Sequence, residues 1–323
     1  MFFTTLLSDS NFGRYKIQTG LIFRETIFLS KILLNSEVWH AVTKTQIQEL
    51  EVIDRILLRN ILSAHSKTGI EWLYSDCGIL DIKTHIQIRR MMYLHHILSR
   101  KESELIYRIY KTQITSNSPG DWVRLIQSDK LELGIELTEE EIQGVTKNVF
   151  RNYVKKKATI KHLRNLGELK KKHSKSVNLS CDSLKQAEYI QNISLNTSEK
   201  NLLFKLRSRT LEVKKNFPGL HSNEWCTSCY LFPESQSHLL QCPAIVVHLG
   251  YLAGTTSTLD EKDIYRSIEK QKVIVKIYSD ILEIRESLEK ISRNTENLNL
   301  PQIGGPLHLI QTRISVAAPV LCI

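Results

Sequence analysis

Apolar residues recur at intervals of three and four along much of this chain, which is the repeat of one face of an α-helix. Over 45–62 the repeat runs through Ile47, Leu50, Ile53, Leu57 and Ile61. Thr45 is followed three residues later by Gln48, the spacing of a capping box at a helix start. Over 82–98 it runs through Ile82, Ile86, Tyr93 and Ile97. These patterns predict two amphipathic helices.

Three later segments carry the same helical repeat. One helix is expected to begin at Thr138, in a capping box with Glu141, with an apolar face that runs as far as Tyr153. Another is expected over 197–216, before the Pro218-Gly219 break. The most regular stripe comes last and consists of Ile274, Ile277, Ile281, Ile284, Leu288 and Ile291. Strand-like alternation is scarce, and glycine and proline number only 13 and 7. We therefore predict a mostly α-helical fold.

The strongest chemical signal is a cluster of cysteines and one histidine with the spacing C-x2-C-x8-H-x3-C, formed by Cys226, Cys229, His238 and Cys242. His238 and Cys242 are four residues apart, so one helical turn places them on one face. Four soft or borderline ligands with no open position are typical of structural Zn²⁺. His248 and, less strongly, His221 are alternative ligands. The other three cysteines are scattered, which does not resemble a secreted disulfide framework.

Positive charge is concentrated in one segment of the chain. Residues 147–175 contain eleven Lys and Arg against one acid, Glu168, and this local net charge of +10 equals that of the whole chain. Such a concentration is typical of a surface that binds nucleic-acid phosphates, although a solvated helix face or a nuclear-localisation tract has the same composition. The candidate phosphate-binding residues here are Lys147, Arg151, Lys155, Lys156, Lys157, Lys161, Arg164, Lys170, Lys171 and Lys172.

A second basic group precedes the cysteine cluster. Its candidate phosphate-binding residues are Lys205, Arg207, Arg209, Lys214 and Lys215. Nearby aromatic residues, such as Trp225, can stack on unpaired bases. Phe150 and Phe204, at helical spacing, are expected in the core instead.

The sequence contains no complete motif for polymerase or hydrolase chemistry. Tyr74-Ser75-Asp76-Cys77 begins like a polymerase box, but cysteine stands where a second Mg²⁺-binding carboxylate belongs. We expect Asp76 to lie in a turn. Asp263, Asp280 and Glu283 could imitate a nuclease site, but we interpret them as solvent-facing charges on a helix. No run of 18 apolar residues occurs, so no membrane span is expected.

Four stretches resemble the region that follows the polymerase palm in non-LTR (LINE-type, Jockey-like) retrotransposon reverse transcriptases. They begin with ETIFLSKILLNSEVWHAVTKTQIQELEVIDRILLRNIL and GIEWLYSDCGILDIKTHIQIRRMMYLHHIL. The resemblance continues through DWVRLIQSDKLELGIELTEEEI and LLFKLRSRTLEVKKNF to the cysteine cluster and the helix after it. It implies a helical thumb and linker region, then a CCHC zinc knuckle and a long amphipathic helix. The order of the segments is more specific than any one of them.

The resemblance implies a division of the chain into five parts. These are a remnant leading into the thumb (1–40), a helical thumb and linker (41–200), a zinc-knuckle region (201–250), a linker with an amphipathic helix (251–293) and a disordered tail (294–323). In the family the catalytic palm and endonuclease lie upstream, so we expect this chain to begin after them, as in a truncated element copy, and to have no catalytic residue.

The predicted function is binding of template RNA or target DNA as the non-catalytic C-terminal fragment of a reverse transcriptase. We expect an intracellular protein, nuclear or in a cytoplasmic ribonucleoprotein, with other element-encoded proteins as partners and with neither a membrane nor a small-molecule substrate. The alternative is a zinc-stabilised helical module that binds a partner helix through the 274–291 stripe. A cryptic nuclease is a third hypothesis.

Overall fold

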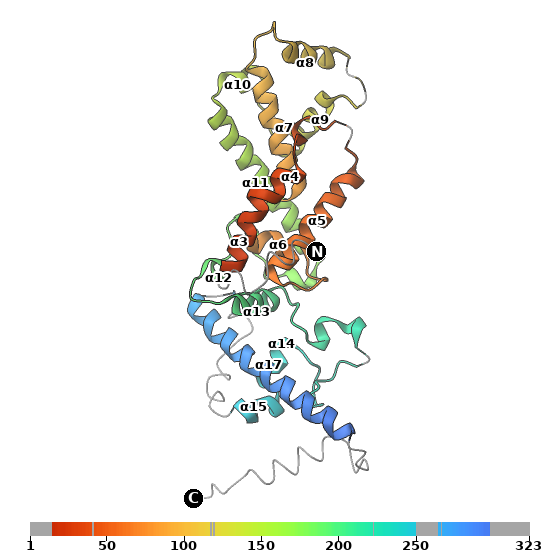
Figure 1. Ribbon diagram of the computed structural model, residues 1–323, viewed down its shortest axis with the longest axis vertical. Coiled ribbons are helices and arrows are strands. Elements are labelled where there is room, and N and C mark those ends of the chain that lie inside the picture. The colour runs from red at the N-terminus through yellow and green to blue at the C-terminus, as the bar shows by residue number, and fades with distance from the viewer. Residues whose placement is uncertain are drawn as a thin grey trace, which may run out of the picture. The chain divides into compact units, whose positions relative to one another are not determined.

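The computed structural model describes residues 15–249, apart from 41, 117, 119 and 222, and residues 264–297, apart from 266. The chain forms two compact units that divide between Thr197 and Ser198. Every regular element of the described residues is helical, and the only β-pairing there is an isolated bridge between Trp225 and Pro233. The prediction of a mostly α-helical fold is therefore confirmed (Figure 1).

The first unit is a bundle built around one central helix. Its elements are α3 (Lys16–Phe23), η2 (Arg24–Phe28), α4 (Leu29–Ile32), η3 (Ser36–Val38), α5 (Lys44–Leu62), α6 (Ile70–Cys77), α7 (Ile82–Leu98), α8 (Leu105–Ser116), α9 (Trp122–Leu133), α10 (Glu139–Gly144), α11 (Lys147–Lys172), η4 (Ser174–Ser176) and α12 (Glu188–Gln191). Helix α7 packs against α5, α8, α9, α10 and α11. The long α11 runs beside α7 in Figure 1.

Helix α7 lies at the centre because apolar and polar side chains on several of its faces are buried. Met91, Leu94 and Ile97 contact a hydrophobic core that includes Trp122 and Phe150 from the neighbouring helices. Phe150 is fully buried, as predicted. The first helical turn of α7 is held by Asp81, whose carboxylate accepts the Thr84 backbone N–H at 2.7 Å.

Polar side chains form a buried cluster between α7, α9 and α11. The Gln87 amide donates to Asp129 at 2.9 Å and to Glu132 at 3.0 Å, and Arg90 donates to Asp129 at 3.1 Å. Lys161 of α11 donates to the Gln87 side-chain oxygen at 2.6 Å and to Glu132 at 3.1 Å. Buried charges are tolerated when they are paired and hydrogen-bonded, so this cluster fixes how the three helices sit against one another.

A second buried ion pair attaches the N-terminal helices to α5. Arg24 and Asp54 are both fully buried, and their bidentate contact has N–O distances of 2.6 and 2.8 Å. Asp54 also accepts the Tyr74 hydroxyl at 3.1 Å, and Arg24 also donates to the Leu80 carbonyl at 2.9 Å. Residues expected to be a remnant thus form part of the first unit's core.

The segment after α11 returns to α6. Gly78 ends α6 at a φ of +64°, and a Cβ there would come within 2.3 Å of the Gln186 backbone nitrogen. Only glycine permits both this conformation and this approach. The Ala187 N–H then donates to the Asp76 carbonyl at 2.8 Å.

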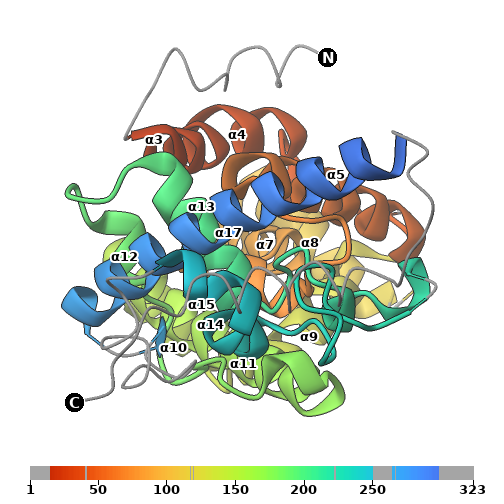
Figure 2. The ribbon, with the colours of Figure 1, turned by 90° about the horizontal axis from the view of Figure 1, so that it is seen from below.

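The second unit has short helices around one long one. Its elements are α13 (Thr197–Arg207), η5 (Lys214–Asn216), η6 (Pro218–Leu220), α14 (Gln236–Gln241), α15 (Pro243–Leu249) and α17 (Ile268–Asn297). Helices α14 and α15 pack along α17, as the view in Figure 2 also shows. The buried face of α17 includes Ile274, Ile277, Tyr278 and Ile281.

Several boundaries differ from the sequence prediction. The capping box of α5 is formed by Thr43 and Gln46, two residues earlier than the predicted Thr45 and Gln48. The Thr138–Glu141 box is confirmed, but its helix ends at Gly144 and α11 begins separately after Thr146, where the backbone is extended. The break lets Ile142 and Phe150 both face the core.

Two other boundaries also differ. The helix expected over 197–216 ends at Arg207, because Arg209 adopts a left-handed conformation with a φ of +51°. Helix α17 continues to Asn297, four residues beyond the predicted end of the amphipathic helix. The rest of the expected tail, from 298 on, lies outside the described residues.

The Arg24–Asp54 pair predicts a large stability effect. Replacing Asp54 with alanine strands a buried guanidinium, which costs about 3–5 kcal/mol of unfolding free energy. Glu49→Ala, an exposed acid on the same helix, is the matched control and should change stability by less than about 0.5 kcal/mol. Urea denaturation of both variants checks this, and equal midpoints would contradict it.

Candidate metal centre and basic surface

The four predicted ligands come together in the second unit. The ligand atoms of Cys226, Cys229, His238 and Cys242 all lie within 4.8 Å of one another. The three cysteines are buried and His238 is partly exposed. The sulfurs of Cys226 and Cys242 are 3.8 Å apart, and Cys229 Sγ is 3.4 Å from His238 Nε2. A tetrahedral ion with metal–sulfur bonds of about 2.3 Å separates its sulfurs by about 3.8 Å. The group can therefore hold a metal ion.

A tight turn presents the first two cysteines. The Cys226 N–H donates to the Phe232 carbonyl at 2.8 Å, and the Tyr230 N–H donates to the Cys226 carbonyl at 2.9 Å. Tyr230 has a φ of +57°, which reverses the chain after Cys229. These backbone bonds direct both thiols to the same side of the turn.

The last two ligands come from a short capped helix. Ser235 caps α14 by accepting the His238 backbone N–H at 3.0 Å. The helix ends at Gln241, and Cys242 is extended before Pro243 begins α15. The helix therefore stops before the proline, whose ring disfavours a helical conformation of the residue before it. Neither His221 nor His248 joins the group, and both are exposed.

One thiol of the group favours a negative charge. The hydrogen bond from Cys242 lowers the pKa of the Cys226 thiol despite its burial, so one of the two is readily a thiolate. Thiolates are the metal-binding form of cysteine.

Glu234 supports the metal loop from inside and was not identified from the sequence. Its buried carboxylate accepts the Thr227 N–H at 3.1 Å, the Thr227 hydroxyl at 3.0 Å and the Lys214 N–H at 3.2 Å. Arg285 of α17 lies 3.0 Å from the same carboxylate. The contact ties the loop between Cys226 and Cys229 to α17. No local motif marks this acid, because its partners are 7 to 51 residues away in sequence.

All of α11 lies within the predicted basic segment, and six of its cations are both exposed to solvent and unpaired. These are Lys147, Arg151, Lys155, Lys156, Arg164 and Lys172. Among the described side chains, none of the six has a hydrogen-bond or ion-pair partner. The first three are four residues apart and so form one row along the helix.

Other predicted cations of α11 are held by the protein. Lys171 pairs with Glu168 at 2.8 Å, and Lys170 donates to the Leu179 carbonyl at 2.7 Å. Lys157 lies over the Tyr153 ring, with 5.6 Å from Nζ to the ring centroid.

Lys161 is a correction to the predicted phosphate-binding set. Only 7% of this residue is exposed, and its ammonium contacts Gln87 and Glu132 in the buried cluster. It therefore stabilises the helix packing and is not available to phosphate. Sequence spacing could not show this, since Gln87 lies 74 positions away.

The basic residues before the cysteines do not share one helix. Lys205 and Arg207 lie at the end of α13, where Arg207 stands over the Tyr265 ring at 5.3 Å, and Arg209 lies in the loop that follows. Lys214 and Lys215 form part of η5, next to Glu234, whose carbonyl accepts the Lys215 N–H at 2.9 Å. Phe204 is fully buried, as predicted.

The end of α7 lies beside the start of α11, where a His95 ring nitrogen is 2.9 Å from the Val145 carbonyl. Burial lowers the pKa of His96, and the charges of Arg100 and Lys147 add to this effect. Arg100, just after α7, contacts His96 at 3.1 Å and pairs with Glu104 at 3.8 Å. The two helix ends are separated by about fifty positions in sequence, so no run of charge revealed this.

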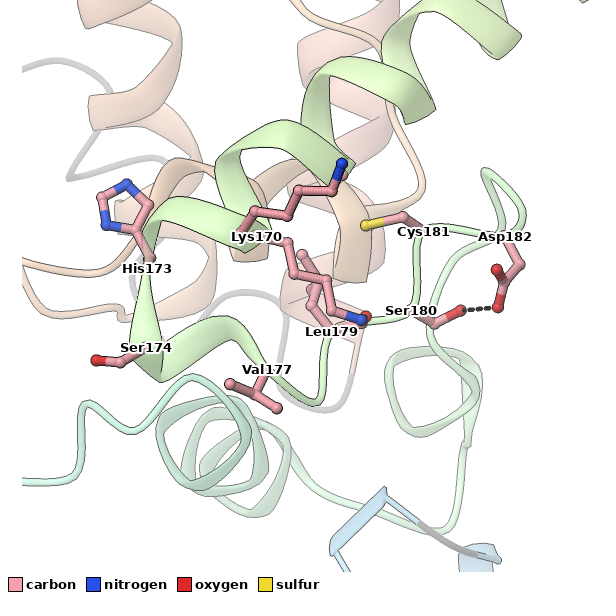
Figure 3. Close-up of a pocket in the computed structure, with 10 residues that line it drawn as sticks. Lys170, His173, Ser174, Val177, Leu179, Ser180, Cys181 and Asp182 are labelled. Carbon is pink, nitrogen blue, oxygen red and sulfur yellow. Dashed lines mark hydrogen bonds between the residues drawn. The ribbon is translucent and has the colours of Figure 1, made fainter.

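A cavity of about 480 Å³ lies beyond the end of α11 (Figure 3). Lys170, Lys171 and Cys181 line it, and the Ser180 hydroxyl on its rim donates to Asp182 at 3.1 Å. Both lysines are engaged elsewhere, and burial raises the pKa of the Cys181 thiol. The cavity thus adds no free cation or thiolate.

The polymerase-like box is part of the core. Asp76 lies in helix α6, contrary to the expected turn, and its buried carboxylate accepts the Tyr189 hydroxyl at 2.8 Å. Within the described residues, the cysteine–histidine group is the one cluster of at least three metal-ligating side chains. Asp280 and Glu283 do not belong to it, and Asp263 lies outside the described residues.

The apolar stripe of α17 is largely occupied within its own unit. Ile274, Ile277 and Ile281 are at most 2% exposed, and α14 and α15 pack on this helix. Of the predicted stripe, Ile291 at the far end is exposed.

No family model matches the chain, and no curated protein or solved structure is significantly similar to it. None of the described helices has both the length and the apolar character needed to cross a bilayer.

The contact between Lys161 and Glu132 predicts that part of the folding stability depends on pH. Burial raises the pKa of Glu132, but hydrogen bonds from Lys83 and Lys161 outweigh this and lower it from 4.5 to about 2. The ionised pair therefore stabilises the fold above about pH 4.5, and this contribution is lost as the pH falls towards about 2. Lys161→Met should be less stable than wild type at pH 7, with the difference shrinking over that window in chemical denaturation.

Lys155→Met removes an exposed cation from the same helix and is the matched control. Its stability should stay within about 0.5 kcal/mol of wild type. If Lys161→Met kept full stability at pH 7 while losing nucleic-acid affinity, the structural assignment of Lys161 would be wrong.

Proposed function

We propose that this chain is a nucleic-acid-binding protein whose Cys226–Cys229–His238–Cys242 group holds Zn²⁺. In this proposal it acts as the non-catalytic C-terminal part of a non-LTR retrotransposon reverse transcriptase and binds template RNA or target DNA. The observation that carries the binding proposal is the set of exposed, unpaired cations on α11.

Zinc is proposed because of the ligands and their closed arrangement. Three thiolates and an imidazole suit a borderline-soft ion, whereas Mg²⁺ and Ca²⁺ require oxygen ligands. All four positions are protein ligands, which is typical of a structural ion. The role we assign to zinc is to hold the turn at Cys226 and Cys229 against α14.

The charge on α11 supports a polyanionic ligand. Like charges four residues apart destabilise a helix, so the row of Lys147, Arg151 and Lys155 works against the helix that carries it. Acids four residues away would relieve the repulsion, but the only acid in 147–175 is Glu168. Regularly spaced phosphates would neutralise the row and release their counterions on binding.

The link to reverse transcriptases rests on the order of segments. A helical unit with a basic outer helix precedes a Cys3His group and a long helix, as the resemblance implies. We assign no catalytic residue, and the proposed location remains a nuclear or cytoplasmic ribonucleoprotein. The alternative role, binding a partner helix through the 274–291 stripe, gains no support, because the first half of that stripe is core.

The zinc proposal is tested by metal analysis of the purified full chain. We expect about one zinc ion per chain in wild type and none in Cys229→Ser. Cys181→Ser, which changes a cysteine outside the group, should retain the ion. Metal-free wild type that also fails to take up zinc on titration would contradict the proposal.

The binding proposal is tested by a salt titration with duplex and single-stranded oligonucleotides. The triple variant Lys147→Gln, Arg151→Gln, Lys155→Gln should bind more weakly and lower the slope of log K against log salt by about three. The control Lys31→Gln, Lys44→Gln, Lys67→Gln removes the same charge from exposed sites elsewhere in the first unit. Equal slopes for the two triple variants would refute a role for the α11 row.

A further inference from the structure

Trp225 presents an aromatic surface at the edge of the metal loop. The bridge between Trp225 and Pro233 is a non-hydrogen-bonded pair, because the flanking residues supply the bonds: the Cys226 N–H to the Phe232 carbonyl and the Glu234 N–H to the Glu224 carbonyl. Side chains directly opposite in such a pair lie close together on one face. Trp225 is 51% exposed, and Pro233 beside it is also exposed.

The neighbouring ring of Phe232 lies beside the metal group instead. By the alternation of side chains in a paired segment, Phe232 points to the opposite face. Its ring lies 5.6 Å from the ring of His238, so it covers a metal ligand. The described residues show no such contact for the Trp225 ring, whose backbone is held by the bridge to Pro233.

Two lysines are held against the metal loop near Trp225. Lys214 donates its N–H to Glu234 and its ammonium to Asn223, two positions before Trp225, at 2.9 Å. Lys215 is exposed and donates its N–H to the Glu234 carbonyl. Neither ammonium has an ion-pair partner among the described residues. Glu224 is exposed nearby, but alternation directs it away from Trp225.

An exposed aromatic ring with two cations nearby matches the base and the phosphate of an unpaired nucleotide. Bases stack on aromatic rings whatever their sequence, and lysines meet the phosphates. A protein partner is less well matched, since lysines are depleted at protein–protein interfaces. A duplex is also poorly matched, because its bases are already stacked on one another.

We propose that the face formed by Trp225, Pro233, Lys214 and Lys215 binds single-stranded nucleic acid, with an unpaired base stacked on Trp225. This inference rests on the proposed function and narrows it. The row on α11 contacts phosphates of either form, whereas the Trp225 face distinguishes unpaired bases from duplex.

The test uses the full chain loaded with zinc and three fluorescent ligands. These are an oligouridine of about 20 nucleotides, an abasic strand of the same length and a duplex of the same length. Trp225→Ala and Trp225→Leu should each weaken oligouridine binding about tenfold or more, because both lose the ring. Trp225→Tyr should restore most of it. Val247→Ala, a change at another exposed apolar residue of this unit, should have no effect.

Duplex affinity should be unchanged in all four variants. Wild type should bind the abasic strand as weakly as Trp225→Ala binds oligouridine, a comparison that needs no mutation. Metal content and circular dichroism confirm that each variant is folded.

The outcomes separate the two proposals. If wild type binds neither oligouridine nor duplex, the proposed function and this inference both fail. If wild type binds both but does not distinguish the abasic strand, or if Trp225→Ala weakens single strand and duplex equally, only this inference is overturned. Concentration-dependent self-association that Trp225→Ala abolishes would overturn it too, by assigning the face to a second copy of the chain.

Discussion

The first unit depends on ion pairs that hold charged side chains in or beside its core. Asp54 is matched by Arg24, Asp129 by Arg90, and Glu132 by Lys83 and Lys161. Because removing a charge from water is costly unless a partner compensates it, these acids are bound to cations of the unit's own helices. On α11 itself the only acid is Glu168, so the exposed cations of this helix leave a surface that an external polyanion can neutralise.

The second unit depends on a different constraint. Its helices α14 and α15 are short, and the segment between α13 and α14 has little regular structure of its own. A metal ion bound to four ligands would supply the order that such a segment lacks, since metal affinity in small sites is also folding energy. Glu234 and Arg285 pass that order on to α17. The same loop displays Trp225 and the two lysines, so binding chemistry and metal binding would be coupled in this unit.

The sequence predicted features that depend on neighbours within one or two helical turns. Helices α5 and α7 follow from their apolar repeat, and the metal ligands follow from a spacing that already fits one tight turn and one helical turn. Features set by remote contacts were not predictable. In the sequence Lys161 is indistinguishable from its exposed neighbours, because its partners Gln87 and Glu132 belong to α7 and α9. The end of α13 depends on Arg209 and on the return of the chain to Glu234. The break between α10 and α11 had only Gly144 as a local signal.

The central claim is that the outer face of α11 contacts nucleic acid. Ultraviolet cross-linking of the full chain to RNA, followed by mass spectrometry of the peptides, maps that contact without any substitution. We predict cross-linked peptides from the exposed side of α11, around Lys147 to Arg164. Cross-links confined to helix α5 around Lys44, or an α11 without cross-links in a complex that forms, would contradict the account.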